Sequence, residues 1–173
     1  MKIIPLAAAA LSACLSISSA GAQEQRVIGE YRDWVGVTYQ EDGKDVCYIY
    51  SFPKSEEGDY TRRGPAYVQV TRRVATGAKD VVSFEAGYPY DQDSNVTVSV
   101  DGGNRFELFT HPQTPETAWA PDDSTDKALV EAMRKGVKMT VRGRSSRGTD
   151  TSDSYSLLGF TDAHQAIAKA CGG

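Results

Sequence analysis

Histidine is almost missing from this chain, which has only His111 and His164 in 173 residues. Neither residue has the spacing to a cysteine that a zinc site requires. His111 precedes a proline in a loop, and the sequence has no Gly-x-Ser-x-Gly motif, so a serine nucleophile beside a positioned base is not indicated. We interpret both histidines as surface or helix-capping residues. The sequence therefore predicts no catalytic residue, no metal and no cofactor.

Long apolar segments are also missing, except at the N-terminus. There, Lys2 precedes an apolar segment over residues 3–17 and the small residues Ala-Gly-Ala at 20–22. This order is typical of a signal peptide and its cleavage site, and the apolar segment is too short and too rich in serine for a transmembrane helix. We predict that residues 1–22 are a cleaved signal peptide and that residues 23–173 form a single domain, because they are too few for two.

Cysteine is scarce, with three residues. Cys14 follows Leu-Ser-Ala, the kind of pattern that precedes the lipid-modified cysteine of bacterial lipoproteins, but it comes early and a well-formed cleavage site follows it. We therefore disfavour a lipid anchor at Cys14. Cys47 and Cys171 remain, and in the oxidising compartment that an exported protein enters, such a pair usually forms a disulfide. Two free buried thiols are the alternative, and a metal site is poorly supported.

A strong charge of either sign is missing as well. The formal net charge is −4, so no global attraction to nucleic acid or to an anionic membrane is expected, and only local basic patches remain as candidates. We predict no nucleic-acid partner.

What the chain does contain is a series of short segments that alternate apolar and polar residues, as antiparallel strands do. Asp42-Gly43 and Asp101-Gly102 stand between such segments and predict hairpin turns. Residues 52–64 and 111–116 are predicted loops, and residues 27–28 a candidate edge strand. The pattern indicates eight strands, at residues 34–39, 46–51, 66–72, 81–85, 95–100, 105–109, 137–142 and 154–160, and residues 117–120 are a candidate for a further short one.

Two short helices are predicted late in the chain. The first begins at the acidic residues after Pro121, has one apolar stripe that includes Leu129 and Met133, and ends at Gly136. The second begins at Thr161 and precedes Cys171. Because strands and helices do not alternate, a parallel sheet is not expected. The fold class predicted is all-β, an antiparallel sandwich or barrel with two short helices near the C-terminus.

Several segments resemble the invasion-associated locus B family, in matching order over most of the mature chain. They lie at residues 63–68, 86–90, 117–120, 126–133, 145–149, 155–160 and 170–171. The resemblance implies an immunoglobulin-like β-sandwich and an exported, periplasmic or surface-associated protein of Gram-negative bacteria. It also implies an association with host-cell invasion and no established enzymatic activity. Some members carry extra cysteines soon after the first tryptophan, which this chain lacks after Trp34.

Paired carboxylates, as glycoside hydrolysis requires, occur at three places in the sequence. All three fall in predicted turns or helix caps, where aspartate has a structural reason to be: Asp91/Asp93, Asp122/Asp123 and Asp150/Asp153.

Arginine clusters at residues 62–63, 72–73 and 142–147. Such arginines commonly line the solvent faces of strands. One turn brings the third group together, so Arg142, Arg144 and Arg147 are a candidate contact for an anion or a glycan. Three aromatic residues are a candidate recognition surface, or else core and loop anchors: Tyr88, Tyr90 and Trp119.

We therefore predict an exported, non-enzymatic binding protein, periplasmic or secreted, whose partner is a protein or glycan of the envelope or of a host surface. One alternative is a periplasmic enzyme that acts on a glycan or envelope polymer through turn carboxylates. Another is a purely structural envelope protein. A buried carboxylate pair in a cleft would favour the enzyme, and clustered Arg and Tyr on a surface would favour binding.

Overall fold

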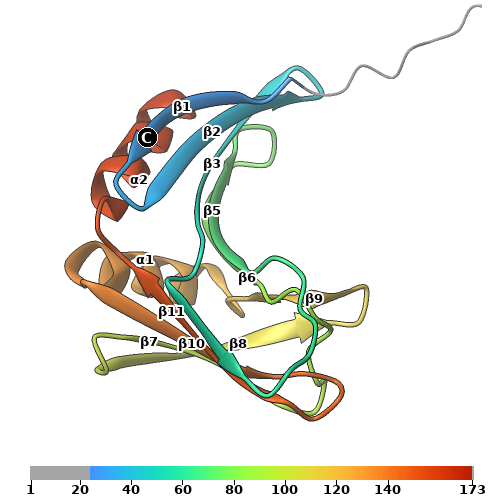
Figure 1. The fold of residues 1–173 in the computed structure, drawn as a ribbon. Helices are drawn as coiled ribbons and strands as arrows, with labels where there is room; N and C mark the ends of the chain where they lie inside the picture. Colours follow the sequence, from blue (N-terminus) through green and yellow to red (C-terminus); the bar gives the residue numbers. More distant parts are fainter. Residues whose placement is uncertain (1–23, 173) are drawn as a thin grey trace, which may run out of the picture.

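The computed structural model describes residues 24–172; the predicted signal peptide, its cleavage site and Cys14 lie outside this range. Within it the chain forms eleven strands and two helices (Figure 1). The strands are β1 (Arg26–Tyr31), β2 (Trp34–Glu41), β3 (Lys44–Ser51), β4 (Ser55–Gly58), β5 (Tyr67–Arg73), β6 (Ala78–Glu85), β7 (Val96–Val100), β8 (Asn104–His111), β9 (Thr114–Trp119), β10 (Lys138–Arg144) and β11 (Asp150–Ser156). The helices are α1 (Asp123–Lys135) and α2 (Phe160–Ala170).

All strand pairs are antiparallel, and the strands form one sheet in the order β1-β2-β3-β5-β6-β9-β8-β7-β10-β11-β4. Strand β8 pairs with both β7 and β9 and so joins the two halves of the sheet. Figure 1 shows the sheet bending so that the two halves form two layers, with α1 and α2 on the concave side. The predicted all-β, antiparallel, sandwich-like fold with two helices near the C-terminus is confirmed.

Both predicted hairpin turns are formed. Asp42 and Gly43 have φ values of 51° and 72°, and Asp101 and Gly102 have 50° and 70°. A two-residue hairpin turn whose twist follows that of the flanking strands requires positive φ at both of its central residues, and aspartate and glycine adopt positive φ at low cost. The first turn joins β2 to β3 and the second joins β7 to β8.

The core lies between the two layers. Most strands contribute alternate residues to it, for example Val68 and Val70 from β5 and Val98 from β7, all with no exposed surface. Helix α1 adds Leu129 and Met133, which are also fully buried. The amphipathic stripe predicted for α1 is therefore the face that closes the core.

Helix α1 begins where the sequence predicts it. Asp122 is the N-cap, and its Oδ1 accepts a hydrogen bond of 2.8 Å from the backbone N–H of Thr125. One turn further, Asp126 is buried against β6, where it accepts a hydrogen bond of 2.8 Å from Val82 N–H. Neither helix in the described part of the chain is long and apolar enough to cross a bilayer.

Helix α2 and the residues that hold it form a C-terminal clasp. Phe160 packs edge-on against Trp34, with ring centroids 4.9 Å apart, and the Trp34 indole N–H donates to Ser156 O. A disulfide joins Cys171, at the end of α2, to Cys47 on β3, and spans 124 residues of sequence. The clasp thereby fastens the end of the chain to two of its first strands.

Three segments differ from the sequence prediction. Strand β4 lies inside the predicted loop at residues 52–64; all four of its residues are exposed, so no alternation of burial reveals it. Strand β9 begins at Thr114, inside the predicted loop at residues 111–116. Strand β11 begins four residues earlier than predicted, because its polar residues Asp150 to Asp153 pair with β10 and β4. It also ends four residues earlier, at Ser156, and Phe160 is already the first residue of α2.

Candidate binding cleft

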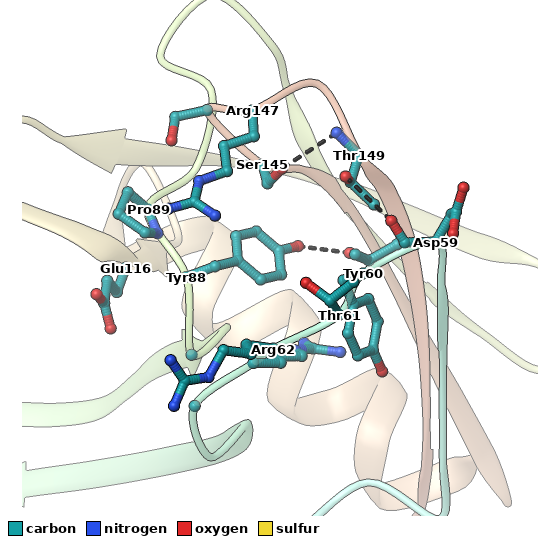
Figure 2. Close-up of a pocket in the computed structure, with 15 residues that line it drawn as sticks. Asp59, Tyr60, Thr61, Arg62, Tyr88, Pro89, Glu116, Ser145, Arg147 and Thr149 are labelled. Atoms are coloured by element: carbon teal, nitrogen blue, oxygen red, sulfur yellow. Dashed lines mark hydrogen bonds between the residues drawn. The ribbon is translucent and has the colours of Figure 1, made fainter.

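Three loops meet at one end of the fold and enclose an open cleft of about 660 Å³. They are residues 59–66 between β4 and β5, residues 86–95 between β6 and β7, and residues 145–149 between β10 and β11. Loops presented by a rigid sheet are a common position for binding residues. Figure 2 shows side chains from all three loops around this cleft.

The base of the cleft is organised by Arg63, whose side chain is only 3% exposed. Its Nη1 and Nη2 donate to the two carboxylate oxygens of Asp153 at 2.6 and 2.5 Å, and its Nε donates to Ala86 O at 2.7 Å. The guanidinium lies over the rings of Tyr60 and Tyr88, 5.5 and 5.1 Å from their centroids. Three hydrogen bonds and two ring contacts hold this cation, and they fix the first loop to β11.

The electrostatics of Arg63 follow from these contacts. Burial alone would lower the pKa of Arg63, but the hydrogen bonds and charge of Asp153 outweigh it and raise the pKa above its ordinary value. Asp153 lies on the buried side of β11 between Thr151 and Tyr155, all three with little exposed surface. A charge in that position requires a bonded partner, and Arg63 supplies it.

A close approach of two glycines joins the first loop to the second. Gly64 N–H donates to Gly87 O at 2.8 Å. Gly87 has φ of +70°, and a Cβ there would lie 2.2 Å from Gly64 O. Only glycine fits at this position without moving one of the loops.

The turn at residues 145–149 is bonded to the other two loops. Ser146 N–H donates to Pro89 O at 2.8 Å, and the Thr149 hydroxyl donates to Asp59 O at 3.4 Å. The Tyr88 hydroxyl is hydrogen-bonded to the Thr151 hydroxyl at 2.5 Å. The three loops thus hold one another, so the cleft is organised before any ligand arrives.

The rim of the cleft carries charges that no ion pair uses. Arg62 and Arg147 are exposed, and within residues 24–172 neither is in salt-bridge contact with a carboxylate. The same holds over that range for the rim acids Asp59 and Glu116. In Figure 2, Arg147 and Arg62 lie on opposite sides of the Tyr88 ring. The rim is therefore balanced in charge, with two guanidinium groups available to a ligand.

A family model for the invasion associated locus B (IalB) protein matches residues 34–168. The chain belongs to this family. The matched range includes all three loops of the cleft, and the family predicted from the sequence is confirmed. Among solved structures, the chain is similar to the crystal structure of invasion associated protein B from Bartonella henselae, with a TM-score of 0.57 and 20% sequence identity. The alignment covers 82% of this chain and 95% of that one, and it supports the fold. A search of curated proteins found no match.

The cleft of this IalB-family chain contains two of the candidate residues taken from the sequence, Arg147 and Tyr88. Arg144 is instead paired with Asp150 at 2.9 Å and Asp91 at 3.7 Å, where it ties two loops together.

The other three candidates lie outside the cleft. Arg142 is exposed on β10. Tyr90 is 3% exposed and belongs to the core, as the alternative interpretation had it. Trp119 is half-buried on β9, opposite Ser83. The three candidate arginines therefore do not lie together, and neither do the three candidate aromatic residues. One arginine and one aromatic residue, Arg147 and Tyr88, lie in the cleft.

The interpretation of the arginines as solvent-facing residues is wrong for Arg63 and for Arg72. Arg72 is 7% exposed and donates to both carboxylate oxygens of Asp80, at 2.7 and 3.0 Å. His164 Nε2 lies 2.9 Å from the same carboxylate, so this histidine is also buried rather than on the surface. Burial raises the pKa of Asp80, but His164 and Arg72 outweigh it and lower the pKa to about 2.

Four of the six aspartates considered as catalytic pairs in this IalB-family chain have structural partners. Asp122 caps α1, and Asp91 and Asp150 pair with Arg144. Asp153 pairs with Arg63, although it lies on a strand and not in the predicted turn. Within the described residues no cluster of three His, Cys, Asp or Glu side chains could hold a metal ion.

The Arg63–Asp153 pair is the feature of the cleft that sequence reasoning missed. The one available signal was alternation along β11: Asp153 shares a face with the buried Tyr155, so it needed a cation. Nothing in the sequence says which arginine supplies it, because Arg63 is 90 residues away.

Proposed function

We propose that this chain is an exported, non-enzymatic binding protein that recognises an acidic glycan in the cleft. The observation that carries the proposal is two guanidinium groups, Arg62 and Arg147, that have no carboxylate partner among residues 24–172 and lie on either side of an aromatic cleft built on mutually bonded loops. Guanidinium groups bind carboxylates, sulfates and phosphates through two parallel hydrogen bonds.

The remaining rim groups fit the rest of a sugar. Hydroxyls of Thr61, Ser146 and Thr149 and the carboxylates of Asp59 and Glu116 can hydrogen-bond to sugar hydroxyls. These acids also balance the arginines, so a highly charged polyanion such as nucleic acid is disfavoured. A ligand with one acidic group among many hydroxyls matches this arrangement best.

Two observations support an exported, surface-facing role. The Cys47–Cys171 disulfide is typical of proteins that fold in an oxidising compartment. Membership of a family named for its association with invasion agrees with an envelope or host surface as the source of the glycan.

The test is binding of the purified mature protein to a panel of acidic and neutral glycans, measured by calorimetry. We expect the acidic members to bind, and Arg147→Ala or Arg62→Ala to weaken binding at least about tenfold, the value of one charge-assisted hydrogen bond. Arg142→Ala is the matched control, because Arg142 is exposed on β10 outside the cleft.

Three results would contradict the proposal. One is the absence of binding to every acidic glycan of the panel. A second is an equal loss of affinity in the Arg142→Ala control. The third is release of reducing ends from any glycan during incubation, which would favour an enzyme instead.

A further inference from the structure

The side of the sheet that faces away from the core is unusually rich in aromatic residues. Along β3, Cys47 and Ile49 point into the core, so Tyr48 and Tyr50 point outward. Phe52, directly after β3, and the neighbouring strands add further rings on the same side, of which Phe52 is 55% exposed and Phe109 is 44% exposed. This outer aromatic face consists of Tyr39, Tyr48, Tyr50, Phe52, Tyr67, Phe109 and Trp119.

Four of these rings form a continuous series. Tyr39 contacts Tyr48 with centroids 6.2 Å apart, Tyr48 contacts Tyr50 at 6.1 Å, and Tyr50 contacts Phe52 at 5.6 Å. The rings are packed against one another and stand on a paired sheet. They therefore present a rigid surface that loses little conformational entropy when a ligand binds.

The groups between the rings are polar and mostly uncharged. Gln69 lies opposite Tyr50, and Thr71 lies opposite Tyr48. At the far edge, Arg73 and Glu41 pair with each other at 3.5 Å. A neutral sugar has an apolar C–H face, which can pack on an aromatic ring, and hydroxyls, which can hydrogen-bond to hydroxyl and amide side chains beside that ring.

This face continues into the cleft. Tyr67 on β5 pairs with Glu85 on β6, and Glu85 pairs with Thr117 on β9. The residue before Thr117 is Glu116, which lines the cleft. Two strand spacings separate Tyr67 from Thr117, a distance of about 10 Å. A ligand that begins in the cleft can therefore extend across Thr117 and Glu85, whose carboxylate accepts a hydrogen bond of 2.8 Å from the Thr117 hydroxyl, to Tyr67 and the ring series.

We propose that the ligand is an extended glycan chain, with an acidic unit in the cleft and neutral units on the outer aromatic face. This inference rests on the proposed function, because the acidic unit is the one bound by Arg62 and Arg147. The ring series, with Gln69 and Thr71 beside it, matches neutral sugars, and the charged rim of the cleft matches the acidic one. A single sugar would leave the face without a ligand.

The test uses hyaluronan oligosaccharides, in which glucuronate alternates with N-acetylglucosamine, as a length series from the disaccharide to the octasaccharide. We expect calorimetry to show that the octasaccharide binds about tenfold more tightly than the disaccharide, the size of one good aromatic contact. Tyr67→Ala should bring the ratio of the two dissociation constants close to one. Val137→Ala, which removes an exposed apolar side chain elsewhere, should leave the ratio unchanged.

Circular dichroism and thermal unfolding of each variant establish that it is folded, and Phe52→Ala provides a second, more exposed substitution on the same face. Equal affinity at every chain length would overturn this inference and leave the proposed function standing. If no hyaluronan oligosaccharide of any length bound, the inference would be overturned. The proposed function would then be decided separately by the panel of acidic and neutral glycans. Self-association of the protein that Tyr67→Ala abolishes would overturn it in favour of a second copy on this face.

Discussion

Replacing Cys171 with serine should lower the stability of the protein more than most single substitutions outside the core. The disulfide spans 124 residues, and closing a loop of that length removes unfolded-state entropy worth about 5 kcal/mol at 25 °C. The substitution itself is nearly isosteric at a residue that is 9% exposed, so little packing is lost. For a chain of this size, 5 kcal/mol corresponds to a fall in Tm of about 10–20 °C.

The assay is urea unfolding of wild type and Cys171→Ser, each with and without a reducing agent. We expect a large difference in midpoint under oxidising conditions and almost none in reductant, where both chains lack the cross-link. The m-value of the variant should rise, because an unfolded chain without the cross-link is more expanded. Equal midpoints under oxidising conditions would refute the reasoning, and so would a large difference that persists in reductant.

Three further predictions concern buried polar groups and the cleft. Burial raises the pKa of Asp126 to about 6, so the folded state keeps this proton to a higher pH than the unfolded state does. The free energy of unfolding of the wild type should therefore fall by about 2–3 kcal/mol as the pH rises from 4 through 6. Denaturation of Asp126→Asn at several pH values should show that this fall is gone. Arg63→Ala should cost about 3–5 kcal/mol of unfolding free energy, because Asp153 is left buried without a cation. Gly87→Ala should cost more than about 2 kcal/mol in the same assay, because its Cβ would collide with Gly64 O.

Each of these predictions has a matched control. Asp123→Asn changes an exposed acid of the same helix turn and should leave the pH dependence as it is in wild type. Arg63→Lys keeps the charge but loses the bidentate geometry, so its cost should fall between wild type and Arg63→Ala. Gly43 has φ of +72°, close to that of Gly87, but open space around it, so Gly43→Ala should cost only the backbone strain of about 1 kcal/mol. Equal losses at Gly43 and Gly87 would show that the loop contact contributes nothing.

The local features of the fold follow from the sequence because short-range chemistry determines them. Asp42-Gly43 and Asp101-Gly102 adopt positive φ at both residues, as a tight hairpin requires. Asp122 caps α1, and the apolar stripe of that helix is its buried face. Strand β4 shows the limit: its exposed Ser-Glu-Glu-Gly has no pattern, and only pairing with β11 makes it a strand.

Burial of charge is the feature that local pattern cannot reveal. Arg62 and Arg63 are adjacent in the sequence, yet one is exposed at the rim and the other is buried in the base of the cleft. The difference arises from Asp153, Tyr60 and Tyr88, which the fold brings together from three segments. The sequence is equally compatible with burial of Arg62 or of Arg63, so only the three-dimensional structure identifies the buried arginine of the cleft.

Strand β11 connects the two parts of the molecule that these predictions address. Near its start, Thr151 bonds to Tyr88 and Asp153 pairs with Arg63; at its end, Ser156 O accepts from Trp34 in the clasp. None of these cleft contacts passes through α2 or the disulfide. Reduction should therefore lower the global unfolding free energy without changing ligand affinity at temperatures where the protein stays folded. A change of more than about twofold in Kd on reduction, which is about 0.4 kcal/mol, would show instead that the clasp holds the cleft in shape.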